Sequence, residues 1–191
     1  GDIQERIRII DSKGYEYKAK LTILKEAART LNYLTENNLL QYADLEKKVE
    51  DVHSSYDRTG KELKGVEARL REVQPLIKNI SNYQRLKPVY DAFQKAKDKP
   101  GFKARHEAEL VIFEAARSTL LAMQGDEKLP SLKTLQAEQA QLFEEQKRLY
   151  AERNRVKKEA KQIETIKSNV DTFLAPSAEH DRDHLRSTQR E

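Results

Sequence analysis

The chain has 191 residues, of which 36% are charged and 37% hydrophobic, and its formal net charge at pH 7 is +4. This mixture is typical of long helices and coiled coils, and so small a net charge does not by itself indicate a nucleic-acid partner. Because there is no cysteine, thiolate catalysis, cysteine-based metal sites and disulfides are excluded.

The sequence has no pattern of a membrane span or of a signal peptide. No apolar run reaches the roughly 18 residues needed to cross a bilayer, and the start of the chain lacks the basic-then-apolar pattern of a signal peptide. We therefore expect a soluble, cytoplasmic protein that contacts no membrane. The only methionine is Met123 and the chain opens with Gly1, which favours an excised part of a longer protein.

The first third of the chain predicts two helices. Ile3, Ile7 and Ile10 have helical spacing, and Gly14 offers a stop. A second helix is expected over 15–36, closed by the two asparagines that follow it. One face of this second helix is apolar, and it comprises Tyr17, Leu21, Leu24, Ala28, Leu31 and Leu34.

The clearest pattern in the sequence is a heptad seam between residues 45 and 80. Its members are Leu45, Val49, Val52, Tyr56, Thr59, Leu63, Val66, Leu70, Val73, Ile77 and Ile80. The seam predicts a long helix over 42–95. Pro75 cannot donate to the carbonyl four residues before it, so we expect a kink near residue 75, and Pro88 threatens a second break.

Further elements are expected in the second half of the chain. The sequence DKPG at 98–101 predicts a turn, and a helix over 103–123 carries apolar residues on several sides, so we expect it to be buried on more than one side. After a loop, a last helix is predicted over 131–174. Its seam is half polar and comprises Leu135, Gln139, Leu142, Gln146, Leu149, Arg153, Val156, Ala160, Ile163, Lys167, Val170 and Leu174. Phe143, Tyr150, Ile166 and Phe173 lie beside the seam and are expected to complete its core.

These two long helices cover their apolar stripes only by lying against each other or against another chain. Because a buried helix is expected between them, we predict an all-α fold. Its architecture would be an elongated antiparallel helical hairpin or coiled coil, with shorter helices packed at its base and tip. Residues 1–174 would form a single helical domain, and 175–191 a flexible polar tail.

Two basic stretches are the candidate nucleic-acid-binding surfaces. The first contains Lys147, Arg148, Arg153, Arg155, Lys157, Lys158 and Lys161. The second runs from Arg85 to His106 and contains Lys95, Lys97, Lys99, Lys103 and Arg105, interleaved with Tyr83, Tyr90, Phe93 and Phe102. Such patches hold phosphates without sequence preference. The alternative interpretation is a solvated helix flank with ion pairs, and for the rings a place in the core.

Catalytic and metal-binding patterns are weak. His180 and His184 have the spacing of two metal ligands on one helix face, but no third ligand is near, and an incidental pair in a polar tail is the plainer interpretation. The sequence contains no phosphate-binding loop, nucleophile elbow or dinucleotide fingerprint. We therefore expect no metal, no cofactor and no enzymatic activity.

Several stretches resemble the helical region that follows the nuclease domain in relaxases (mobilization nucleases) of Firmicutes conjugative or mobilizable elements. They are DSKGYEYKAK at 11–20, KEAARTLNYLTENNL at 25–39, HEAE at 106–109, LPSLKTLQAE at 129–138 and KSNVD at 167–171. The resemblance spans residues 2–174. It implies a parent enzyme that nicks DNA through a catalytic tyrosine and a histidine-bound metal. Neither is recognisable here, so no catalytic residue is carried over.

Two functional hypotheses follow. The first is a non-catalytic relaxase domain that aids DNA mobilization by binding DNA, or coupling and accessory proteins of the transfer machinery. The second is a structural coiled-coil spacer or dimerisation module that binds no nucleic acid, which the long seam favours. The half-polar second seam leaves the oligomeric state open.

Overall fold

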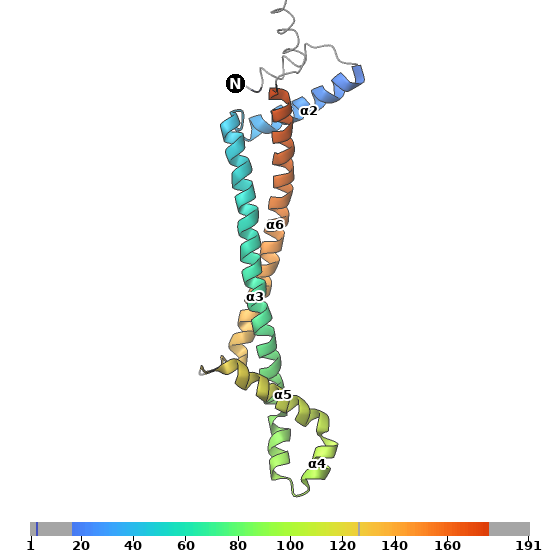
Figure 1. Ribbon diagram of the computed structural model, residues 1–191, viewed down its shortest axis with the longest axis vertical. Helices are drawn as coiled ribbons and strands as arrows, with labels where there is room; N and C mark the ends of the chain where they lie inside the picture. The colour runs from blue at the N-terminus through green and yellow to red at the C-terminus, as the bar shows by residue number, and fades with distance from the viewer. Residues whose placement is uncertain (1–2, 4–16, 126, 176–191) are drawn as a thin grey trace, which may run out of the picture. The chain divides into compact units, whose positions relative to one another are not determined.

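The fold is all-α. The computed structural model describes residues 3, 17–125 and 127–175, and no β-strand occurs among them. Five helices follow one another between residues 17 and 174 of the described chain. They are α2 (Tyr17–Glu36), α3 (Tyr42–Lys95), α4 (Lys99–Arg105), α5 (Glu107–Gln124) and α6 (Leu132–Leu174) (Figure 1). The expected first helix beyond Ile3, the tail from residue 176 and the His180/His184 pair lie outside the described residues.

The chain divides into two compact units. The first comprises Gly1–Arg58 with Arg153–Glu191, and the second comprises Thr59–Glu152. The helices α3 and α6 each contribute a segment to both units.

In the first unit, α3 and α6 lie side by side and antiparallel. Tyr42 at the start of α3 hydrogen-bonds Asp171 near the end of α6, and Lys48, further along α3, pairs with Glu159, which precedes Asp171. The buried core between them is aliphatic, and it comprises Ile3, Leu34, Leu39, Leu45, Val52, Val156, Ile163, Ile166 and Val170. The predicted seams therefore meet here.

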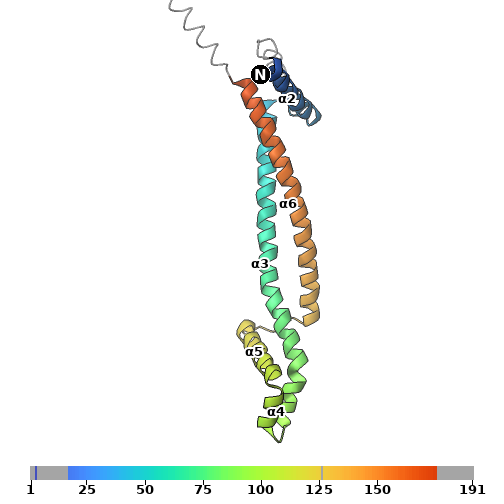
Figure 2. The same cartoon turned by 90° about the vertical axis from the view of Figure 1, so that its right-hand side faces the viewer.

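Helix α2 lies across this antiparallel pair, beside the start of α3 and the end of α6 (Figures 1 and 2). It ends as predicted at the asparagines: Asn38 has a φ of 56°, and the amide of Leu39 donates to the Leu34 carbonyl over 2.7 Å. This arrangement satisfies the last carbonyls of the helix.

The buried face of α2 matches the predicted one only in part: Leu34 is buried as predicted, and Leu24 and Leu31 are half-buried. Ala27, Thr30 and Leu34 are buried, whereas Leu21 is 43% exposed and Ala28 is exposed. The reason is a polar contact from a distant part of the chain, because Asn169 of α6 donates to the Thr30 hydroxyl over 3.1 Å. The helix is thus turned so that Thr30 faces α6.

Three of the four polar members of the second seam have partners on α3. Arg153 lies over the Tyr56 ring, 4.3 Å from its centroid, and Lys167 donates to the Tyr42 hydroxyl over 3.2 Å. In the second unit, Gln146 donates to Glu67 over 3.5 Å. A half-polar seam is therefore paired within the chain.

In the second unit, α3 packs against α5 and the first part of α6 (Figure 2). Its core comprises Val73, Ile80, Leu120 and Leu135, with Leu76, Ile77, Tyr83, Leu129, Leu132 and Leu142 packed around them. Arg69 of α3 holds Glu138 of α6 through two hydrogen bonds. These bonds keep the pKa of the Glu138 carboxyl below its ordinary value.

Helix α3 continues through Pro75 and Pro88 without a break. The carbonyl of Pro75 accepts a hydrogen bond from the Asn79 side chain over 2.8 Å. The turn predicted at 98–101 is instead the start of α4, with Asp98 as its N-cap and Pro100 in its first turn. A proline is tolerated there because its missing N–H would have no helical partner.

Helix α5 is buried on one face, not on several as predicted. Leu110, Phe113, Ala116 and Leu120 form that face. Val111 is 60% exposed and Leu121 is 63% exposed, because α3 covers one side only. Phe143 and Tyr150, expected in the core beside the α6 seam, are also exposed, whereas Ile166 and Phe173 are buried as predicted.

Candidate nucleic-acid interface

The end of α3, the turn after it and α4 carry five cationic side chains within eleven residues. These are Lys95, Lys97, Lys99, Lys103 and Arg105, which we call the α3–α4 basic patch. All five side chains are exposed, and none forms an ion pair with another residue in the described part of the chain. The turn lies at one end of the second unit (Figure 1).

Two aspartates lie in or just before the basic patch, and each accepts a hydrogen bond. Asp98 accepts from the amide of Gly101 over 3.1 Å and so caps α4. A Cβ at Gly101 would collide with the Asp98 carboxylate, so a larger residue there would force this carboxylate to move. Asp91 accepts from Lys87 over 3.0 Å, one helical turn away. Asp98 keeps its negative charge while it caps α4, and Glu107 lines the same hollow as Lys103, but none of the five cations forms an ion pair with a described carboxylate.

The aromatic rings near the basic patch pack on one another. Phe102 lies against Phe93, with ring centroids 6.1 Å apart, and stacks on His106 at 4.4 Å. Tyr83 and Tyr90 both stack on Phe113, at 5.0 and 4.5 Å. The four rings are half-buried and not part of the fully buried core, and their packing fixes α4 and α5 against α3.

The basic stretch on α6 is divided between the two units, and its arginines are used internally. In the second unit, Arg148 binds Glu145 over 2.6 Å and Glu152 over 3.1 Å. In the first unit, Arg153 covers the Tyr56 ring and Arg155 lies 3.7 Å from Glu159. The guanidinium groups of this stretch are thus poor candidates for free phosphate contacts.

The lysines of the same stretch remain available. Lys147 in the second unit and Lys157, Lys158 and Lys161 in the first are exposed, with no ion pair to any other described residue. The three in the first unit lie within about one helical turn of α6. They form a weaker candidate site than the α3–α4 basic patch, because fewer charges are free.

A polar cluster in the first unit was not found by sequence reasoning. Lys167 donates to Asp171 over 2.8 Å, and Tyr42 donates to the same carboxylate over 2.7 Å. Both contacts lower the pKa of the Asp171 carboxyl, and the bond to Asp171 raises the pKa of the Tyr42 hydroxyl. The i,i+4 pair is visible in the sequence, but its tyrosine partner lies 129 residues away. The cluster ties helices together and has no acid or base with an unusual state near neutral pH.

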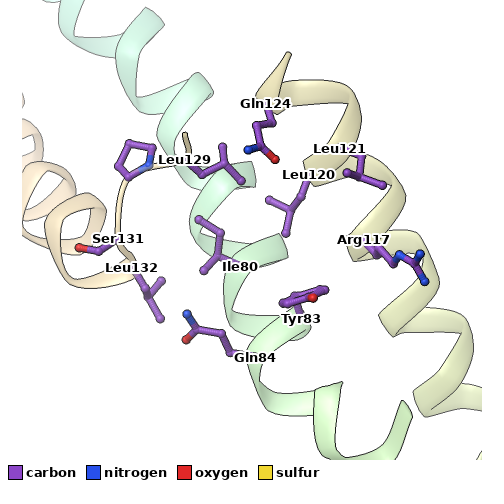
Figure 3. A pocket seen from close by; sticks show the side chains of 11 residues that line it. Ile80, Tyr83, Gln84, Arg117, Leu120, Leu121, Gln124, Leu129, Ser131 and Leu132 are labelled. Atoms are coloured by element: carbon purple, nitrogen blue, oxygen red, sulfur yellow. The ribbon is translucent and has the colours of Figure 1, made fainter. Parts of the chain in front are cut away.

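A cavity of about 500 Å³ lies in the second unit between α3, α5 and the segment that leads into α6 (Figure 3). Its wall is mainly apolar, with Arg117, Gln84 and Gln124 at its edge. Arg117 is engaged, because it donates to the Tyr90 hydroxyl over 3.1 Å. The Ser131 hydroxyl in its wall accepts from the Thr134 amide at the start of α6, and no histidine or carboxylate lines the cavity beside it, so the lining forms no catalytic constellation.

No three histidine, aspartate or glutamate side chains gather to hold a metal in the part of the chain that the structure describes. None of its described helices has a stretch apolar enough to span a bilayer. Comparison with protein-family models, curated proteins and solved structures found no match.

Proposed function

We propose that this chain is a cytoplasmic, non-catalytic helical domain that binds DNA through the α3–α4 basic patch. The observation that carries the proposal is the set of five exposed cations there, none of which forms an ion pair with another described residue. Phosphate contacts by such side chains supply non-specific DNA affinity through counterion release. Lys157, Lys158 and Lys161 would add a second, weaker contact.

The relaxase resemblance supplies the biological setting of this proposal. A domain that follows a DNA-nicking enzyme would aid conjugative mobilization by holding the DNA, or by engaging coupling and accessory proteins. The support is the similarity of the five sequence stretches together with the free positive charge. Nothing in the geometry requires a catalytic residue in this part of such a protein.

The test is DNA binding by fluorescence anisotropy across a salt series. The chain is compared with a variant in which Lys97, Lys99, Lys103 and Arg105 are replaced by glutamine. At low salt we expect the variant to bind duplex DNA more than tenfold more weakly. Its slope of log affinity against log salt should be smaller by about 3.6, since each phosphate contact contributes about 0.9.

A matched control removes the same number of charges elsewhere in the second unit. Lys61, Lys64, Lys128 and Lys133 are exposed and have no ion pair with another described residue. Their replacement by glutamine should weaken binding much less. Equal losses in both variants would mean that net charge, not the basic patch, governs binding. No binding by the unmodified chain at low salt would refute the proposal.

The second candidate function is a structural spacer, and one observation favours it. The seam residues Leu45 and Val52 of α3 are buried against Ile163 and Val170 of α6 within the same chain. The seam therefore needs no second chain, which argues for a spacer over a dimerisation module. A monomer by analytical ultracentrifugation that lacks DNA affinity would support this role.

A further inference from the structure

We infer that the α3–α4 basic patch holds double-stranded DNA by its phosphates alone, with no base stacked on its aromatic rings. This inference rests on the proposed function and names the form of DNA and the mode of contact. It follows from the contacts that the Phe102 ring makes and from the kinds of cation in the basic patch.

The first step concerns the rings. Proteins that favour single-stranded DNA offer exposed ring faces on which bases stack. Here Phe102, the ring that lies among the cations, is half-buried between Phe93 and His106, with centroids at 6.1 and 4.4 Å. The His106 ring stacks on Phe102 and the tilted Phe93 ring packs against it, so a base that stacked on Phe102 would compete with these contacts. The Phe102 ring thus packs α4 against Phe93 of α3.

The second step concerns the kind of cation. Four of the five charged groups in the basic patch are lysines. A lysine ammonium is a compact point charge that suits phosphate, whereas the bidentate contact that identifies guanine is made best by arginine. Arg105 is the only arginine of the basic patch. The lysines therefore favour phosphate contacts, which do not depend on base sequence.

The third step chooses between duplex and single strand. A surface that contacts only phosphates binds best where phosphates are densest, and duplex DNA carries about one negative charge per 1.7 Å of axis. A single strand compensates for its lower charge density with base stacking, which this surface does not offer. Five contacts would give a salt slope of about −4.5 on duplex and about −3.5 on a single strand.

The experiment measures the affinity of the full chain for one mixed-sequence duplex, for each of its separated strands and for oligo-dT of the same length. We expect the duplex to bind severalfold more tightly than any single strand, and a second duplex of different base composition to bind within twofold of the first. The variant Phe102→Leu, which keeps apolar packing but removes the ring face, should bind both forms of DNA as the unmodified chain does.

Three other outcomes are decisive. Tighter binding of single strands would overturn the inference and leave the proposed function standing, and a loss of that binding in Phe102→Leu would identify the ring as a stacking platform. A marked preference among duplex sequences would likewise overturn it. Failure to bind any DNA at low salt would overturn the proposed function itself. If the helical circular dichroism of Phe102→Leu shows that this variant is unfolded, the ratio of duplex to single-strand affinity of the unmodified chain tests the inference by itself.

Discussion

The ring stack around Phe113 gives a stability prediction for the unit that carries the α3–α4 basic patch. Phe113 is 2% exposed and stacks on both Tyr83 and Tyr90. Replacement by leucine keeps an apolar side chain there but removes both ring pairs. Each such pair contributes about 0.5–1.5 kcal/mol beyond its buried area, so we expect a loss of about 1–3 kcal/mol in the free energy of unfolding.

The assay is urea unfolding followed by circular dichroism at 222 nm, and the matched control is Phe143→Leu. Phe143 is 44% exposed and makes no ring contact with another described residue, so its replacement should change the free energy of unfolding by less than about 0.5 kcal/mol. If Phe113→Leu were as mild as this control, the reasoning that the stacked rings fix α5 against α3 would be wrong.

Three further predictions concern polar contacts. Thr30→Val should cost about 1–2 kcal/mol in urea unfolding, because the Asn169 amide would lose its acceptor at a half-buried position. The pKa of Asp171 is lowered in the folded state, so its contribution to stability is present above the ordinary carboxyl pKa of about 4 and is lost as the pH falls through the lower folded value. Asp171→Asn should therefore flatten the acid side of a stability–pH curve, and an unchanged curve would contradict this. Gly101→Ala should displace the Asp98 carboxylate from its capping position and increase proteolysis at the α3–α4 turn, whereas unchanged proteolysis would contradict the capping role.

The long seams were predictable because their period is a local property of the sequence. Leu45, Leu70 and Ile80, placed on the α3 seam by spacing alone, are all buried. Burial of Thr59 at 1% exposure follows from the same spacing despite its polar side chain. Where one face of a helix is plainly the apolar one, its pattern identifies the core.

The shorter helices were harder because they have more than one apolar face. In α2, a stripe through Leu21 and Ala28 competes with one through Ala27 and Thr30, and spacing does not choose between them. The choice depends on Asn169, which is distant in sequence. In α5, apolar content alone predicted burial on several sides, but only the face with Leu110, Phe113, Ala116 and Leu120 is buried among the described residues.

For the candidate interface, the sequence located the cations but not which of them are free. The engagement of Arg148 with Glu145 and Glu152 lies at helical spacing, so it could have been read from the sequence. The stacking of Arg153 on Tyr56 could not, since it depends on the register between two helices. Identifying the free lysines therefore required the fold.

The pairing of α3 with α6 also has a consequence for the order of folding. Arg69 and Glu138 meet across 69 residues of chain, whereas Tyr42 and Asp171 meet across 129. Closing the longer loop costs about 0.5 kcal/mol more in chain entropy. We expect the contacts between α3 and α6 that lie closest in sequence to α5, such as Arg69 with Glu138, to form first. Those at the start of α3 should form last. The earliest tertiary structure would then include the helices that carry the lysines of the basic patch.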